Sequence, residues 1–472
     1  MSIITTDTFL KMMQAFNGRM TSQIIRDLIL NHTRASSDMA TNYERYKGRQ
    51  LPIDLRTFPD ANKINNKIGN DFRGEIIDQS VGYLFGKPAT YTLDKARFND
   101  AGAYKNASDA LQNFLRTNHI EDLDAETGKM ASICGTASRL CYIDKAGAER
   151  VMNVNPWEVI YIYDRSLDEV QYALRYYVMT DVGTNGSASP KLRIEFYDSE
   201  NVTYWIRQGA GEFILDATEP VNPQPHLFSK VPLIEFRNNE ERLADFAKVE
   251  GLVDAYDRTL SDAQNELEEF RQAYMLFKGA QIDKETITAA RNTGAFSLPV
   301  GTDASFLTKQ INDVFLESHK KTLRENIYRF SNSVDMSAEK FSGSGASGEA
   351  RKWQLLPLEQ KVGIKERKFQ KASSKMFEII STAWQKKGII IDWRDIKISL
   401  DRNVPIELAL EADVQVKLKG LISDRTRLEI FSPVRDVDAE LSQMKTEAED
   451  SVDLDSVPDE SASENTDENT DE

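Results

Sequence analysis

The side chains that most often bind metals or act as nucleophiles are few and scattered along the chain. Its four histidines form neither an H-E-x-x-H motif nor a grouping with cysteine, so their spacing argues against a zinc site. They are His32, His119, His226 and His319. The only two cysteines, Cys134 and Cys141, are separated by six residues, which fits no zinc pattern. This spacing favours burial as small apolar side chains in a reducing, cytoplasmic setting. We therefore expect no metal and no other cofactor.

One short motif has the glycines and lysine of a phosphate-binding loop but fails in its details. In "GYLFGKP" (82–88) the first glycine is one residue too close, and Pro88 stands where a Ser or Thr would hold Mg²⁺. The motif therefore predicts a turn that ends a helix. Carboxylates four residues apart, such as Asp262 and Glu266, fall in a long helical pattern and predict a solvated face rather than a nuclease cluster. The sequence also has no G-x-S-x-G elbow and no dinucleotide fingerprint, so we expect that the protein is not an enzyme.

The net charge is concentrated at the C-terminal end. The 472 residues carry a formal charge of −16, and residues 447–472 hold twelve Asp/Glu and no Lys/Arg, so −16 − (−12) leaves about −4 for the rest. This tail should be disordered, either as a solvated tail or as a docking segment for a basic partner. The body lacks the basic patch of a tight DNA-binding protein. No run of eighteen apolar residues predicts a transmembrane helix, and the N-terminus has no signal-peptide pattern, so no membrane contact is expected.

The N-terminal half has the pattern of an α+β domain. Four segments show the three- and four-residue apolar spacing of helices. They are residues 1–45, 62–86, 105–117 and 121–138. Between residues 88 and 245, five segments rich in β-branched and aromatic residues predict strands. They are "RLCYID", "EVIYIYD", "VQYALRYYVM", "KLRIEFYD" and "VTYWIR". Between two of them, "VGTNGSASP" (182–190) predicts a surface loop.

A long amphipathic helix follows the α+β part. Nine residues alternate in steps of four and three, which is a heptad seam on a helix of about 28 residues and about 42 Å. They are Val249, Val253, Tyr256, Leu260, Ala263, Leu267, Phe270, Tyr274 and Phe277. The seam predicts packing against other helices, from the same chain or from another copy. Residues 248–271 hold seven Asp/Glu against three Lys/Arg, which is typical of a solvated face.

A small insert with turn signals, residues 278–310, separates this helix from a second helix at 311–334. The polar face of the second helix is predicted to carry Lys320, Lys321, Arg324 and Arg329. In the tract that follows, 335–348, nine of fourteen residues are Gly, Ser or Ala, so its backbone has high conformational freedom.

The remainder returns to regular structure before the acidic tail. The helical pattern of 349–388 contains Pro357, which should kink the helix or divide it. Residues 389–405 are strand-like, and 406–449 are helical.

Six phrases occur along the chain in an order that is informative as a set. They are "YKGRQLPI" (46–53), "NKIGNDFRGEIIDQSVGYLFGKPATY" (66–91), "VNPWEVIYIYD" (154–164), "VPLIEFRNNEERLADFAKVEGLVDAYDRTLSDAQNELEEF" (231–270), "SGEARKWQLLPLEQK" (347–361) and "LISDRTRLEIFSPVRDVDAELSQMKTEAE" (421–449). Each phrase and their order resemble the portal proteins of tailed bacteriophages, in the branch of long-tailed phages of Gram-positive hosts. Each phrase alone has low specificity, but the six in this order are informative, and the resemblance extends from about residue 40 to residue 449. The "FSP" at 431–433 departs from the family pattern, which has a more apolar approach to this proline.

The resemblance implies an α+β portal-type subunit with a mixed α/β wing, a long helical stem, a small clip and a helical crown, assembling as a ring. The implied parts are the N-terminal helices and wing (1–245), a stem helix (246–277), the clip (278–310), a second stem helix (311–334), a tunnel loop (335–348), a long kinked wing helix (349–388), a returning wing strand (389–405), the crown (406–449) and a disordered acidic tail (450–472).

The resemblance also implies partners and a place of action. The expected ring has 12 copies of the chain and forms a DNA channel at one capsid vertex of the virion, after synthesis in the host cytoplasm. It would serve genome packaging, head–tail joining and DNA ejection. The expected partners are double-stranded DNA, held transiently and without sequence specificity, the terminase large subunit, a head-completion adaptor protein, and the major capsid and scaffolding proteins. Energy would come from the terminase, because this chain has no phosphate loop.

The tunnel loop would supply the contacts to DNA. Lys340 is its one basic residue and the expected transient phosphate contact, although the alternative is that it only keeps an exposed loop soluble. Phe341 would brace the loop or touch DNA, and Ser342, Gly343 and Ser344 would give the loop its freedom. A second set of charged residues is expected to make channel or intersubunit contacts. That set is Lys320, Lys321, Arg324, Arg351, Lys352, Glu266 and Glu269. A weakly acidic body would suit a conduit, since each phosphate contact strengthens binding and would stall a sliding duplex.

Two other classes stay open on the residues alone. The first is a helical scaffold or adaptor protein of virion assembly, with an extended coiled coil and no channel. The second is a nucleic-acid enzyme. Assembly into a ring would exclude the first, and measurable ATPase or nuclease activity of the purified chain would favour the second.

Overall fold

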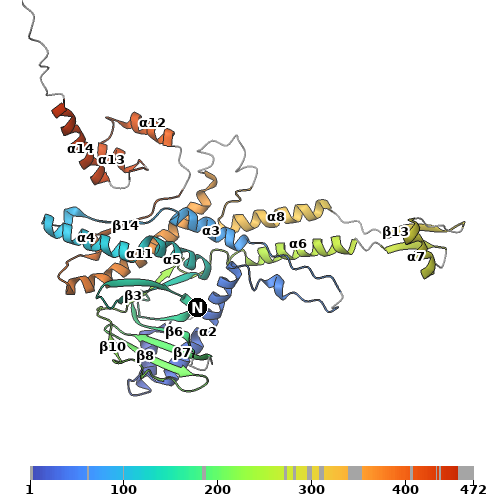
Figure 1. Cartoon of the computed structure of the whole chain (residues 1–472), viewed down its shortest axis with the longest axis horizontal. Coiled ribbons are helices and arrows are strands. Elements are labelled where there is room, and N and C mark those ends of the chain that lie inside the picture. The colour runs from blue at the N-terminus through green and yellow to red at the C-terminus, as the bar shows by residue number, and fades with distance from the viewer. Residues whose placement is uncertain are drawn as a thin grey trace, which may run out of the picture. The chain divides into compact units, whose positions relative to one another are not determined.

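The structure is a computed structural model of the chain. It describes residues 4–60, 63–98, 100–182, 188–270, 274–279, 283–294, 300–307, 313–337, 353–403, 408–431, 433–434 and 437–454. The chain divides into two units, Met1–Asn403 and Val404–Glu472. Helices and sheets are mixed along the first unit (Figure 1), so the predicted α+β class is confirmed.

The larger sheet of the first unit is almost entirely antiparallel. Its strands follow the order β1-β5-β6-β7-β8-β10, with β9 paired to β8, and only β1 runs parallel to its neighbour. Their bounds are β1 Ile4–Thr5, β5 Val159–Tyr163, β6 Val170–Val182, β7 Ala188–Tyr197, β8 Asn201–Gln208, β9 Ile214–Leu215 and β10 Gln224–Pro225. The strands predicted in this region are confirmed. The loop predicted at 182–190 is wrong at both ends, because β6 continues to Val182 and β7 begins at Ala188; residues 183–187 lie outside the described residues.

Two N-terminal helices cover one face of this sheet, α1 (Thr6–Gln14) and α2 (Ser22–Tyr46). Their apolar side chains, among them Phe9 and Leu28, form a buried cluster with residues of β5, β6 and β7. The single helix predicted over 1–45 is therefore wrong in one respect. Asn17 and Gly18 have φ angles of 57° and 72°, a left-handed pair that ends one helix before the next begins.

A smaller sheet has the order β11-β3-β4 and packs against helices. Its strands are β11 Leu233–Arg237, β3 Thr136–Ile143 and β4 Glu149–Val154. The neighbouring helices are α3 Phe72–Phe85, α4 Ala101–Thr117 and α5 Ile120–Cys134. The helix predicted over 121–138 ends earlier, since Gly135 adopts a φ of +82° and the chain then enters β3. Both cysteines are buried free thiols, as predicted.

The long helix α11 spans Leu356–Lys386 and lies across the smaller sheet. Pro357 occupies its first turn, where the missing N–H costs no hydrogen bond, so the proline marks the beginning of the helix rather than a kink. Residues 353–354 are helical and Leu355 interrupts the helix before α11, while residues 349–352 of the predicted long helix lie outside the described residues. After α11, β14 (Ile396–Ser399) pairs antiparallel with β2 (Thr90–Leu93). The strand predicted within residues 389–405 is therefore present. Short 3-10 turns lie at Pro52–Leu55, Lys95–Arg97, Pro156–Glu158 and Trp393–Asp395.

The second unit is helical in its described part. Its helices are α12 Leu408–Leu418, α13 Asp424–Glu429 and α14 Val437–Leu454. The helical prediction for 406–449 is confirmed for these ranges. The predicted start of disorder at 450 is wrong, because α14 continues to Leu454; residues 455–472 lie outside the described residues. In the described part of the chain, no helix combines the length and the hydropathy that crossing a membrane requires.

His32 makes the stability of the α2–sheet contact sensitive to acid. Its ring is 5% exposed, and its Nδ1 lies 2.9 Å from the Tyr176 hydroxyl of β6. Burial lowers the pKa of His32 to about 4. Below pH 6.5 the unfolded chain binds a proton that the folded chain does not, so this residue costs stability as the pH falls from about 6.5 to about 4.

We predict that His32→Gln, which cannot titrate, loses less stability on acidification than the wild type. The difference should be roughly 2–2.5 kcal/mol between pH 7 and about pH 4.5, measured by urea unfolding at both values. His319→Gln, at an exposed histidine, is the control. An equal acid dependence of wild type and His32→Gln would contradict the assignment.

Candidate functional site: a helix pair and the networks at its base

Two antiparallel helices, α6 (Glu250–Phe270) and α8 (Asp313–Ser331), lie side by side and extend away from the sheets (Figure 1). At their base, Val249 and Val253 of the α6 side are buried together with Ile327 and Tyr328 of α8. Between the two helices in sequence are β12 (Tyr274–Lys278), α7 (Lys284–Thr293) and β13 (Asp303–Leu307). The predicted pair of long helices with a small insert between them is thus present.

The first of these helices is shorter than the heptad pattern predicts. It ends at Phe270, and Tyr274–Lys278 forms a strand paired antiparallel with Asp303–Leu307. The prediction of a continuous helix to Phe277 is therefore wrong. The apolar and aromatic run "YMLFK" suits a strand as well as a helix, and only the pairing with β13 decides between them.

A polar row on α6 holds an extended segment of the chain. Asp257, Ser261 and Asn265 are four residues apart and buried, and they accept hydrogen bonds from the backbone N–H groups of Asn70, Ile68 and Asn66 at 2.9, 3.0 and 2.7 Å. The side-chain amides of Asn66 and Asn70 donate to the same acceptors. The helix predicted over 62–86 begins only at Phe72 for this reason. The sequence shows the four-residue spacing of these three polar side chains, but nothing in it identifies the segment 66–70 as their partner.

A buried arginine joins α3 to the base of α6. The Arg73 side chain is 1% exposed and donates two hydrogen bonds to Glu250, both at 3.0 Å, and one to Asp254 at 2.7 Å. Arg45 of α2 reaches the same Glu250 at 2.6 Å. Burial raises the pKa of Asp254 and of Asp257, against the attraction of Arg73. Acidic residues that the sequence assigned to a solvated face therefore form an internal network.

A second buried network lies where the chain enters α6. Asp245 accepts from Lys365 of α11 at 2.6 Å, from Ser80 of α3 at 2.6 Å and from Asn238 at 2.9 Å. Lys365 also donates to Ser132 of α5 at 2.6 Å. Burial lowers the pKa of Lys365 to about 8, whereas Lys365 and Lys361 hold the pKa of Asp245 well below its usual range despite its burial.

A serine beside a lysine of lowered pKa, as Ser80 and Ser132 are beside Lys365, can act as a nucleophile in enzymes. The burial of these three side chains argues against that chemistry here. Ser80 and Ser132 are completely buried, and Lys365 is 6% exposed. A substrate therefore has no path to either hydroxyl in this conformation. Among the described residues, no group of three or more His, Cys, Asp and Glu side chains is placed to hold a metal ion.

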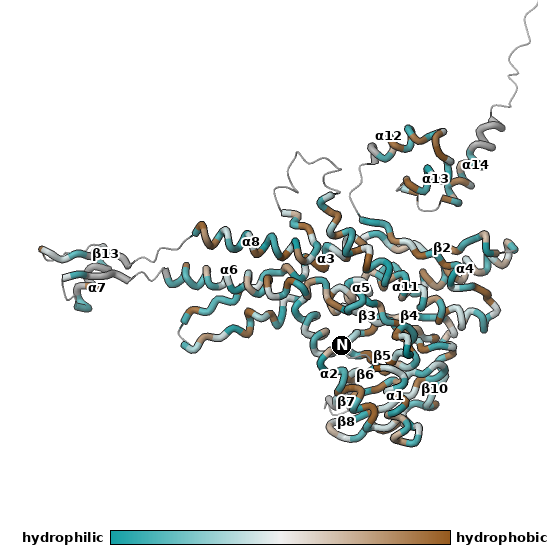
Figure 2. Tube along the Cα trace, turned by 180° about the vertical axis from the view of Figure 1, so that it is seen from behind, coloured by the Kyte–Doolittle hydropathy of each residue, from teal (hydrophilic) through white to brown (hydrophobic). Residues whose placement is uncertain are grey.

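The charged residues predicted as channel or intersubunit contacts divide between two environments. Lys320 is paired with Glu317 at 2.6 Å and Arg324 with Asp335 at 3.3 Å, on the half-buried side of α8. Lys321 and Arg329 are exposed, so the four basic residues do not share one exposed face. On α6, Glu269 is exposed and Glu266 is half-buried. Figure 2 shows mostly hydrophilic colour along α6 and a more mixed pattern along α8.

The predicted tunnel-loop contacts cannot be placed in the same way. The described residues do not include Lys340, Phe341, Ser342, Gly343 and Ser344 of this loop, nor Arg351 and Lys352 of the predicted channel or intersubunit set. They remain predictions.

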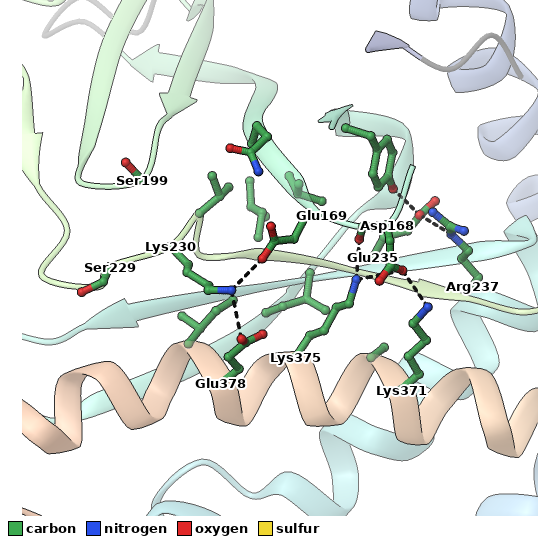
Figure 3. A pocket seen from close by; sticks show the side chains of 18 of the residues that line it. Asp168, Glu169, Ser199, Ser229, Lys230, Glu235, Arg237, Lys371, Lys375 and Glu378 are labelled. Carbon is green, nitrogen blue, oxygen red and sulfur yellow. Dashed lines mark hydrogen bonds and ion pairs between the residues drawn. The ribbon is translucent and has the colours of Figure 1, made fainter. Parts of the chain in front are cut away.

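A cavity of about 280 Å³ lies between α11 and the turn before β6 (Figure 3). Asp168 in this turn accepts from Lys371 at 2.6 Å and is 3.2 Å from Lys375, and Lys230 bridges Glu169 and Glu378 at 2.7 and 2.9 Å. Every charged side chain that lines this cavity has an oppositely charged group within 4 Å. The rim is therefore a set of ion pairs joining sheet to helix, and it offers no unpaired charge to a ligand.

Comparison with known proteins identifies the family. A family model described as "Phage portal protein, SPP1 Gp6-like" matches residues 25–453, which is most of the chain. The chain belongs to this family. The resemblance inferred from the six phrases is confirmed.

Two relatives named portal protein show modest identity over most of their length. The portal protein of Clostridium phage phiCD119 is 26% identical over 392 residues, which cover 79% of this chain and 83% of that protein. The portal protein of Bacillus phage SPP1 is 24% identical over 421 residues, covering 85% of this chain and 78% of that protein. Membership supports a phage portal function, as a structural component of the virion in a capsid-associated oligomeric assembly.

Proposed function

We propose that twelve copies of this portal protein form a ring at one capsid vertex and that double-stranded DNA passes through its centre. The ring serves genome packaging with the terminase large subunit, head–tail joining through a head-completion adaptor protein, and DNA ejection. The family match over residues 25–453 carries the proposal. Capsid and scaffolding proteins are the further partners, and the terminase supplies the energy.

The helix pair supports this role by its shape and its exposed residues. α6 and α8 are joined by a small insert and are buried mainly at their base, so large apolar side chains farther out stay exposed in a single copy. Leu267, Val314 and Phe315 are 57%, 82% and 67% exposed. Apolar exposure of this kind marks surfaces that associate with another chain, and in a closed ring neighbouring copies cover it.

Electron microscopy of the purified protein tests the proposal directly. We expect rings with a central hole. Native mass spectrometry that finds only monomer or dimer at high concentration would favour a helical scaffold or adaptor without a channel. Intrinsic ATPase or nuclease activity of the purified chain would favour an enzyme.

Deletion of residues 342–347 is predicted to leave rings intact and to reduce packaged DNA to a small fraction of the wild-type amount. The reason is that the shortened Gly/Ser tract no longer reaches the duplex. The matched control exchanges the same six residues for an alternating Gly-Ser segment of equal length, which should package normally if reach rather than identity matters. Normal packaging by the deletion variant would exclude a role of this tract in DNA passage.

A further inference from the structure

Two lysines on successive turns of α11 connect this helix to the base of both α6 and α8. Lys361 and Lys365 are four residues apart and therefore project from the same side of the helix. Lys361 donates to the backbone carbonyl of Ser331, the last residue of α8, at 3.1 Å and lies 3.5 Å from Asp245. Lys365 donates to Asp245, five residues before the first residue of α6, at 2.6 Å.

We propose that Lys361 and Lys365 are positioning residues that fix the angle of the α6–α8 pair relative to the α+β body. The significance of that angle for a channel rests on the proposed portal function. The contact itself is a property of one chain and can be tested in any assembly state.

The contact is suited to setting an angle because it is polar and pairs the charges of Asp245 and Lys365. An apolar cluster at the same base, which includes Val253 and Ile327, can slide by small steps without losing much burial. The carboxylate of Asp245 instead accepts from three side chains at 2.6–2.9 Å, and each of these bonds depends on direction as well as distance. Displacing α6 would leave a buried charge without its partner, which is far more unfavourable than a small apolar rearrangement.

The position of the contact gives it mechanical leverage. It lies at one end of α6, whose 21 residues span about 31 Å. A tilt of roughly 10° at the base therefore moves the far end of the helix by about 5 Å. In a ring of such helices, this displacement would change the width of the channel and the position of the insert between α6 and α8.

The deciding variant removes both charges of the central pair, Asp245→Asn with Lys365→Met. Replacing both partners of a buried ion pair is often close to neutral for global stability, whereas replacing one is not. The matched control is Asp124→Asn with Arg139→Met, because that pair is equally buried, joined at 3.0 Å, and linked to α5 and β3 without contacting α6 or α8.

We expect the Asp245/Lys365 variant to keep its urea midpoint and its ring formation, with hydrogen exchange about tenfold faster in α6 and α8 and unchanged in the larger sheet. Packaged DNA should also fall about tenfold, within the usual range of coupling between sites. The control should leave exchange in α6 and α8 unchanged. Unaltered exchange in these helices in the first variant, or an equal increase in the control, would overturn the proposal.

Failure of the proposed function gives a different result. A wild-type protein without rings would refute the channel, but the exchange comparison between the two double variants would still decide whether the lysines fix the helix pair. Faster exchange in α6 and α8 together with intact rings and normal packaging would show that the angle does not matter for packaging, and would overturn the functional part of the inference.

Discussion

Arg73→Met should destabilise the portal subunit by about 3–5 kcal/mol, the largest effect that we expect from a single charge removal. The guanidinium is 1% exposed and is the common partner of Glu250 and Asp254, with Asp257 at 3.9 Å. Methionine has a side chain of similar length but no charge, so these carboxylates at the base of α6 would lose their common partner. Arg45 would be the one remaining cation that the structure pairs with Glu250. The measurement is the free energy of unfolding in urea at pH 7.

The matched control for this prediction is an exposed arginine in the same unit. Arg26 pairs with Glu212 at 2.9 Å, but the two side chains are 37% and 66% exposed. Because water and ions screen such a pair, Arg26→Met should change stability by less than about 1 kcal/mol. If Arg73→Met and Arg26→Met lower the free energy of unfolding by the same amount, the Arg73 network does not hold α3 to α6 in the way described.

The regular elements were predictable because local pattern determines them. The β-branched and aromatic content of β5 to β8 identified these strands, and the heptad seam correctly identified α6 as an amphipathic helix with a helical neighbour. The seam failed beyond Phe270 because the residues of β12 satisfy two patterns, and the choice depends on hydrogen bonds to β13, about 30 residues later in the sequence.

The polar interior of the base was not predictable from composition. Acidic side chains are almost never fully buried, so the sequence predicted a solvated face for Asp254 and Asp257, and nothing in it predicted that Lys365 is buried. Each has its partner in a distant segment: Arg73 for the two carboxylates and Asp245 for the lysine. Asp257 and Lys365 are buried, and Asp254 is half-buried. No window of the sequence contains both members of any of these pairs.

The candidate site was predictable only through the family. The phrases around 231–270 and 347–361 identified the portal resemblance, and the same stretches contain Asp245 and the lysine at 361 that meet at the base. What the phrases could not provide is the pairing between them.

Gly135→Ala is the second variant for which we expect a large loss of stability, more than about 3 kcal/mol. Gly135 ends α5 and begins the turn into β3 with a φ of +82°, and its N–H donates to Ala131 at 2.8 Å while its carbonyl accepts from Asn238 at 3.0 Å. A Cβ at this position would lie 2.1 Å from the carbonyl oxygen of Arg242. The methyl group would therefore force backbone against backbone, and no side chain can rotate away to make room.

Gly147→Ala separates the steric from the conformational contribution to the loss of stability expected for Gly135→Ala. Gly147 has nearly the same φ, +78°, but a Cβ there has no heavy atom within 4 Å, so the alanine variant should lose only the conformational part, about 1 kcal/mol. Urea unfolding of both variants measures the difference, which is the steric part. The steric displacement at Gly135 would also move Arg242 off Glu235, which its Nε reaches at 2.6 Å, and would shift the backbone three residues before Asp245. Equal losses in the two variants would mean that the Arg242 segment moves aside at little cost, which would contradict the steric part of the prediction.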